Sequence, residues 1–137
     1  MLSNKYVRRM ILNKPERARL SKPELTQADI EYFKDKFGNR FVRALRAVEE
    51  NRVKKYFFRP SETYTWIVRG TKRDYLVIPD ILCTGRDFYQ SVVISGDATT
   101  CYHLLAQCIA EIRESYEIIE ATDAERRELY NTWRKTD

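Results

Sequence analysis

The segment Cys83-Thr84-Gly85-Arg86-Asp87-Phe88-Tyr89, followed by Cys101-Tyr102-His103-Leu104-Leu105-Ala106, indicates the fold of this 137-residue chain. The two stretches hold two of the three cysteines and the single histidine. Thiolates and imidazoles on a turn and at a helix start are common ligands of a structural zinc ion. We therefore predict a metal turn that leads into a helix, with Cys83, Cys101 and His103 as ligands.

Length and composition indicate a single charged globular domain, or one domain with an extension. Charged residues make up 33% of the chain, which exceeds the usual quarter. No apolar run approaches the roughly 20 residues that cross a bilayer, and residues 1–5 lack the apolar segment of a signal peptide. We expect an intracellular protein without membrane contact, cytoplasmic or, in a eukaryote, nuclear. Three cysteines in such a compartment favour metal binding or burial over disulfides.

Charge is distributed unevenly along the chain. Residues 1–80 carry 19 Lys and Arg against 10 Asp and Glu, whereas residues 81–137 carry 6 against 10. A basic first half and an acidic second half favour different partners for the two ends, or coexist as two solvated surfaces.

The hydrophobic pattern predicts an α+β fold that begins with helices. Residues 1–20 show only a weak helical pattern. A helix is expected to begin at Ser21 and to end at Gly38, and a second helix to reach about Asn51. Residues 1–50 thus form a basic helical N-terminal region.

Residues 51–137 are expected to form a second unit, which begins with a small three-stranded antiparallel meander. Aromatic and β-branched residues at period two predict strands at 53–59, 64–68 and 75–78. The metal turn follows the meander, and two C-terminal helices follow the turn.

Two patterns define these C-terminal helices. Apolar residues recur at helical spacing from Leu105 to Ile119, which predicts one long amphipathic helix. A capping box at Thr122 and Glu125 opens a last helix.

The Cys/His pattern resembles the SWIM zinc finger, whose motif is Cys-x-Cys, a variable loop and Cys-x-His. Phe88 lies at the family's spacing after the first ligand pair, and the segment from Cys101 to Ala106 is similar to the family's Cys-x-His-Leu-Leu-Ala signature. The likeness covers roughly residues 53–115, and it is nearest to short stand-alone members, including archaeal ones and the SWIM subunit of the Shu complex. It implies a non-catalytic module that binds zinc.

Gly85 departs from the family motif, because the second Cys is expected at this position. Asp87 is one candidate for the fourth ligand, because carboxylates also bind zinc. A water molecule could instead complete the site, or packing could hold the turn without any metal. Cys108 lies seven residues beyond Cys101, about 10 Å along a helix, which is too far for a shared ion. We therefore expect Cys108 to be buried rather than to bind metal.

A basic stripe and neighbouring aromatic residues form a candidate single-strand nucleic-acid surface. The aromatic residues are Tyr56, Phe57 and Phe58. A solvated charged face beside rings that belong to the core would give the same pattern. The stripe consists of Arg40, Arg43, Arg46, Arg52, Lys54 and Lys55.

The resemblance implies an accessory protein of DNA repair and homologous recombination, which binds a RecA-family ATPase paralogue and DNA. The exposed parts of the strands and of the helix from Leu104 would present the contact. A second hypothesis is a nucleic-acid-binding protein that acts alone through its basic half. A remote third is a zinc hydrolase, because a three-ligand zinc with an open position is also how catalytic zinc is bound. The sequence is compatible with a monomer and with a homo-oligomer.

Overall fold

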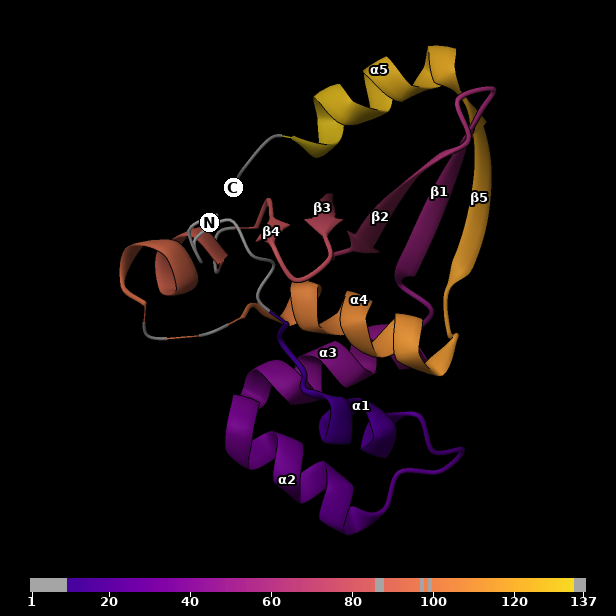
Figure 1. The fold of residues 1–137 in the computed structure, drawn as a ribbon. Helices are drawn as coiled ribbons and strands as arrows, with labels where there is room; N and C mark the ends of the chain where they lie inside the picture. The colour runs from indigo at the N-terminus through magenta and orange to yellow at the C-terminus, as the bar shows by residue number, and fades with distance from the viewer. Residues whose placement is uncertain (1–9, 86–87, 97, 99, 135–137) are drawn as a thin grey trace, which may run out of the picture.

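The computed structural model describes residues 10–85, 88–96, 98 and 100–134, and it has the predicted α+β class. A five-stranded sheet lies between one C-terminal helix on one face and a layer of helices on the other (Figure 1). The strand order is β4-β3-β2-β1-β5, and β5 pairs parallel to β1 whereas the other neighbours are antiparallel. The strands are β1 (Val53–Arg59), β2 (Thr63–Arg69), β3 (Asp74–Ile78), β4 (Leu82–Cys83) and β5 (Glu117–Thr122).

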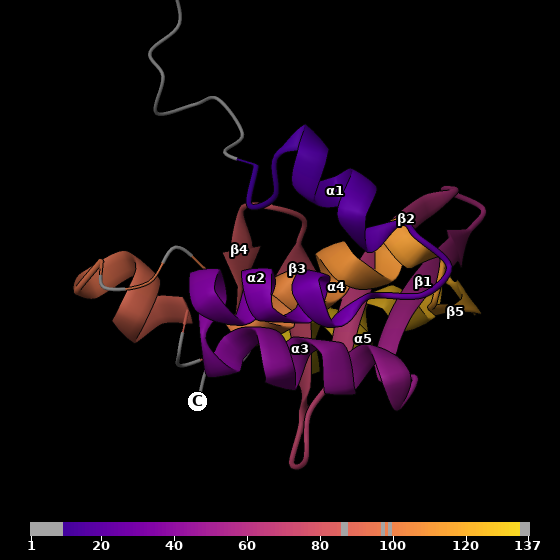
Figure 2. The ribbon, with the colours of Figure 1, turned by 90° about the horizontal axis from the view of Figure 1, so that it is seen from below.

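The helices fall into two groups. Four of them cover the face of the sheet that is viewed from below in Figure 2, and the segment η2, a π-helical turn, projects to one side. The helices are α1 (Lys14–Leu20), α2 (Gln27–Phe37), α3 (Asn39–Glu49), α4 (Tyr102–Arg113) and α5 (Asp123–Trp133), and the π-helical turn is η2 (Phe88–Ile94).

Alternation along the strands builds two cores, one on each face of the sheet. Trp66 and Val68 of β2 join the larger core beneath α1–α4, whereas Ile67 between them packs with Trp133 of α5. The larger core takes side chains from both sides of the predicted boundary at residue 50. No helix of the described chain is both long enough and apolar enough to cross a membrane.

The three predicted strands are confirmed, but the sheet has two more. β4 carries Cys83, and β5 occupies residues that were expected to continue the long helix. That prediction was wrong because α4 ends at Glu114, which takes the left-handed conformation with φ 52°. Glu114 is not glycine, so its conformation gave no signal in the sequence. Beyond it, Ile119 pairs with Tyr56 on the open side of β1, and the helical spacing of the apolar residues was coincidental.

The predicted start at Ser21 of the helix that ends at Gly38 was also wrong. α2 begins after Thr26, whose hydroxyl and backbone N–H both bond the Asp29 side chain in a capping box. Ser21 instead lies at the C-terminal end of α1, which has its own capping box at Asn13. Both capping boxes satisfy backbone N–H groups that a helix start leaves unpaired.

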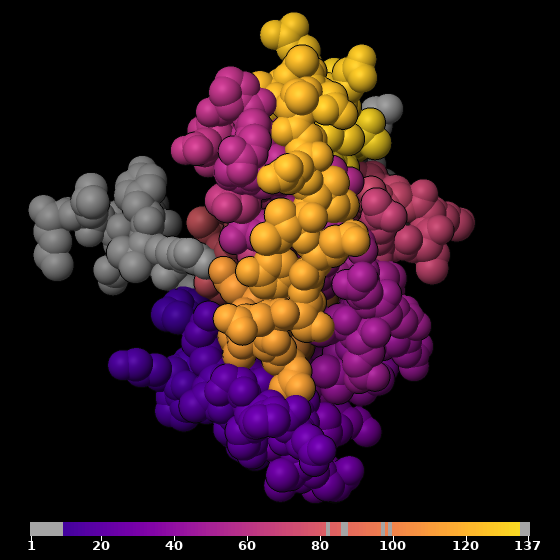
Figure 3. All heavy atoms as spheres, turned by 90° about the vertical axis from the view of Figure 1, so that its right-hand side faces the viewer, coloured from indigo at the N-terminus to yellow at the C-terminus, as the bar shows by residue number. Residues whose placement is uncertain are grey.

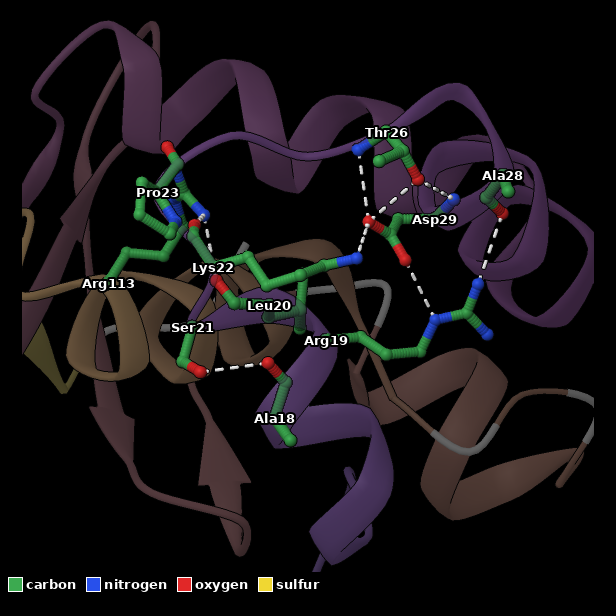
Figure 4. Close-up of polar contacts among 10 residues, drawn as sticks. All are labelled: Ala18, Arg19, Leu20, Ser21, Lys22, Pro23, Thr26, Ala28, Asp29 and Arg113. Atoms are coloured by element: carbon green, nitrogen blue, oxygen red, sulfur yellow. Dashed lines mark hydrogen bonds and ion pairs between the residues drawn. The ribbon is translucent and has the colours of Figure 1, made fainter.

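Asp29 fastens the loop between α1 and α2 (Figure 4). Its side chain is 3% exposed and pairs with Arg19 at 2.9 Å and Lys22 at 2.6 Å. The pKa of Asp29 lies well below its usual range. The hydrogen bond from Lys22 is the largest cause, and the hydrogen bonds from Thr26 and Arg19 lower the pKa further. From the other side of the loop, Arg113 donates to the carbonyls of Leu20 and Lys22 at 2.7 and 2.9 Å.

We predict that Asp29→Asn lowers stability at neutral pH and removes part of its acid dependence. A carboxyl whose pKa is depressed by folding stabilises the protein above its unfolded value of about 4 and loses this effect as pH falls toward its folded value. Urea unfolding between pH 7 and pH 3 measures both effects. Asp35→Asn is the control, because Asp35 is exposed on the same helix and makes no ion pair within the described residues. Equal acid dependence in Asp29→Asn and the unmodified chain would contradict the assignment.

Candidate metal centre

The turn that carries Cys83 is fixed to the edge of the sheet. Cys83 pairs with Val77 across β3 and β4. The next residue, Thr84, extends this pairing, because its N–H donates to the Leu76 carbonyl at 3.2 Å and its hydroxyl accepts from the Leu76 N–H at 3.1 Å. The Gly85 N–H then points back to Cys83 Sγ at 3.4 Å. The Cys83 sulfur therefore has a defined position at the end of the sheet.

The other two side chains come from the start of α4. Cys101 is the residue before the helix, with extended backbone, and His103 lies in the first turn. The order of the elements brings this helix start against β3 and β4 (Figure 1). One ligand atom from each of Cys83, Cys101 and His103 lies within 4.8 Å of the others. Two sulfurs on one zinc ion are about 4 Å apart, so this spacing suits a shared ion.

The three side chains are buried, being 2%, 0% and 6% exposed respectively. The His103 ring lies between two tyrosine rings, with centroids 3.9 Å from both Tyr75 and Tyr102. Neither His103 ring nitrogen has a hydrogen-bond partner in the described chain, although both are buried. An unpaired buried polar atom costs about 1–3 kcal/mol, and a metal bond to one nitrogen would remove that cost there.

Cys101 has the chemistry of a metal-binding thiolate. A hydrogen bond with Cys83, the proximity of His103 and a backbone bond from Leu104 lower the pKa of Cys101 to about 5, against the opposing effect of burial. A thiolate is the form that binds metal. Two sulfurs and an imidazole form a donor set that zinc prefers, so the residues present fit the ion.

Gly85 faces this cluster directly. A Cβ atom at Gly85 would lie 3.3 Å from His103 Nδ1 and 3.5 Å from Cys83 Sγ. A side chain at position 85 would therefore project into the space beside the ligand atoms. This is the geometry expected of a fourth ligand position that here carries no side chain.

Comparison with known proteins agrees with this geometry. The chain is 29% identical over 91 residues to the zinc finger SWIM domain-containing protein 7 homolog of Dictyostelium discoideum. The chain resembles a SWIM zinc-finger protein. The match covers 65% of this chain but only 58% of that protein. No protein-family model matches the chain, and no solved structure matches it.

The structure locates two of the other residues that the sequence analysis singled out near the cluster, and the third lies outside the described residues. Phe88 is buried in the larger core, at the base of η2. Asp87, the candidate fourth ligand, lies outside the described residues. Cys108 is buried, as expected, and does not belong to the cluster; Arg17 Nη1 lies 3.6 Å from its sulfur. Burial raises the pKa of Cys108 to about 11, so it stays a thiol.

Sequence reasoning missed the two rings that enclose His103. Tyr75 was recognised only as a strand residue, and Tyr102 only as the variable residue of the Cys-x-His motif. The Arg43 guanidinium covers the Tyr102 ring at 4.1 Å, which gives this arginine a packing role. No signal in the sequence could have indicated these contacts, because they join β3, α3 and α4.

The predicted basic stripe does not form one continuous surface. Lys54 is buried and pairs with Glu117 at 3.0 Å, while Lys55, next to it, projects from the opposite face of the sheet. Arg52 lies 3.0 Å from Glu50. The arginines at 40, 43 and 46 remain together on α3. Tyr56 and Phe58 pack with Trp133, so of the three predicted aromatic residues only Phe57 shares a face with Lys55.

We predict that Cys83→Ser, Cys101→Ser and His103→Ala each remove zinc from the purified protein, whereas Cys108→Ser leaves it unchanged. The unmodified chain should hold about one zinc ion per molecule, and its loss should lower the melting temperature because metal binding is coupled to folding. Metal analysis by mass spectrometry measures the content. Zinc retained in all three ligand variants would exclude the site.

Gly85→Cys should tighten zinc binding, because it adds a thiolate beside the three existing donors. We expect at least about a tenfold lower Kd, which corresponds to about 1.4 kcal/mol. Competition with a chromogenic chelator measures the Kd. Gly85→Ala is the matched control, since it adds the same Cβ without a sulfur and should not tighten binding. No gain from the cysteine would mean that position 85 is not directed at the ion.

Proposed function

We propose that this chain is a non-catalytic, zinc-binding interaction module of the SWIM type. It would act as an accessory protein of DNA repair and homologous recombination, with a RecA-family ATPase paralogue as protein partner and DNA as a second ligand. The observation that carries the zinc-binding part is the buried Cys83, Cys101 and His103 cluster with its unpaired imidazole nitrogens. The similarity to a SWIM zinc-finger protein supports the same assignment.

The position of the cluster supports a structural role for the ion. Zinc would fasten the edge of the sheet at Cys83 to the start of α4 at Cys101 and His103. Along the chain, η2 follows Cys83. Cys101 and His103 lead into α4, whose side chains belong to the larger core. A metal bond between these two segments would thus set the orientation of η2 relative to the sheet.

Exposed apolar side chains near this cluster support the assignment of a protein partner. Large apolar side chains are exposed on η2 and on the turn before Cys83, although a third of the chain's residues are charged. Clusters of exposed apolar residues typically mark interaction sites. These residues are Ile78, Ile81, Tyr89, Val93 and Ile94, between 41% and 64% exposed.

This surface replaces the helix from Leu104, which the sequence analysis expected to present part of the contact. Every residue from Tyr102 to Ala110 is buried, so the first part of α4 cannot present a contact. The segment that projects from the body is η2 (Figure 2). We therefore assign the protein contact to η2 and its neighbouring turn.

The enclosure of the cluster favours a structural ion over a hydrolytic one. A catalytic zinc keeps a position open to substrate. Here the ligands are at most 6% exposed, and the rings of Tyr75 and Tyr102 pack on His103. The burial of all three ligand side chains therefore supports a structural ion.

Co-purification with a RecA-family ATPase from the same cell tests the partner assignment. We expect a complex at micromolar concentration, and we expect Ile94→Asp to weaken it at least about tenfold, because a charge would be buried in an apolar contact. Ile118→Asp is the matched control: Ile118 is a similarly exposed isoleucine, 55% against 64%, but lies on β5. Titration calorimetry measures the Kd.

Two results would overturn the partner assignment. One is the absence of a complex with the zinc-loaded protein. The other is equal weakening by Ile94→Asp and Ile118→Asp, which would place the contact elsewhere.

A further inference from the structure

One part of the sheet on the α4 side is not covered by any described helix. The Tyr116 ring, in the segment between α4 and β5, meets the Trp66 ring of β2 with centroids 4.8 Å apart. Beyond this point toward the β1–β2 hairpin, Tyr64 is 52% exposed. Ile118, the partner of Lys55 in the pairing of β1 with β5, is 55% exposed. Figure 3 shows β5 along the surface, with the hairpin beside its upper part.

Two neighbouring rings lie between two cations in this open area. The Phe57 and Tyr64 rings lie side by side with centroids 4.7 Å apart. Lys55 Nζ lies 4.2 Å from the Tyr64 centroid and 5.0 Å from that of Trp66. At the other end, the Arg59 guanidinium lies 4.6 Å from the Phe57 centroid. Four side chains of β1 and β2 thus form an array of the order Lys55, Tyr64, Phe57, Arg59, which we name the hairpin array.

The cations of the hairpin array are available to an anion. Lys55 makes no ion pair with any described residue and is held only against rings. Arg59 lies 3.5 Å from Glu120, but both side chains are more than half exposed, and such a pair contributes little. The array therefore offers two positive charges, at the two ends of a pair of rings.

We propose that the hairpin array binds single-stranded nucleic acid. Bases stack on Tyr64 and Phe57, and Lys55 and Arg59 move from the rings to the phosphates. Aromatic side chains beside cations are the recurrent means of binding a single strand, because every base has a face that can stack. Lys55 and Arg59 are four residues apart, about 13 Å along the strand, so their charges follow the direction of a bound backbone.

A single strand fits this surface better than other acidic partners do. A duplex hides the faces of its bases and would leave both rings unused. An acidic peptide would pair with Lys55 but has no group that requires the exposed Tyr64 ring. The inference rests on the DNA-binding part of the proposed function, and it uses none of the metal ligands.

Fluorescence anisotropy with a labelled oligothymidylate of about 16 nucleotides tests the proposal on the full chain. We expect Tyr64→Ala and Lys55→Gln each to weaken binding about tenfold, and Tyr64→Phe to retain it, because phenylalanine keeps the stacking face. Lys55→Gln should also reduce the slope of log Kd against log salt by about 0.7, since one phosphate contact is lost, whereas Tyr64→Ala should leave the slope unchanged.

Two controls match these substitutions. Met10→Ala removes an apolar side chain of similar exposure, 57%, from the segment before α1, and Lys34→Gln removes an exposed lysine from α2. Neither should change the affinity. Unlabelled duplex of the same sequence and a polyglutamate peptide should compete poorly.

The proposal is overturned if the unmodified chain does not bind the oligonucleotide, if the controls weaken binding as much as the array variants, or if polyglutamate competes as well as the oligonucleotide. Failure of the protein-partner assignment gives a different result. In that case the ATPase would not co-purify, while the oligonucleotide affinity would still depend on Tyr64 and Lys55.

Discussion

The burial of α4 on all sides is the constraint on which the rest of the structure depends. Residues 102 to 110 are all buried, between the sheet and the helices α1 and α3. They include no charged side chain, although a third of the chain is charged. A helix that is apolar all round must be covered all round. The N-terminal helices supply one part of this cover and β1–β4 the other.

This central helix also connects the candidate metal centre to the far edge of the sheet. Its first turn carries His103, and Cys101 precedes it, so the ligand cluster forms where α4 begins. Its last turn carries Arg113, which holds the α1–α2 loop, and the left-handed Glu114 then redirects the chain into β5. The two ends of one helix therefore position the two surfaces to which we assign binding.

The two surfaces differ in chemistry in a way that suits different partners. Apolar side chains are exposed on η2 and on the turn before Cys83, which favours a protein contact there. The hairpin array places cations over rings on an open sheet face, which favours a nucleic-acid strand. Because one lies beside the edge strand β4 and the other on β2 and β1, on the far side of β3, both could be occupied in one molecule.

The local features could be predicted from the residues alone: the three strands at 53–59, 64–68 and 75–78, the capping box at Thr122, and the spacing of Cys83, Cys101 and His103. These depend on residues near one another in the chain, where periodicity and helix capping are directly visible. Only the tertiary structure decided that residues 117–122 form a strand, because the open edge of β1 outweighed a helical pattern that no glycine or proline interrupted. It also decided which rings face Lys55 and that Gly85 points at the ligand cluster, since both depend on contacts between distant segments.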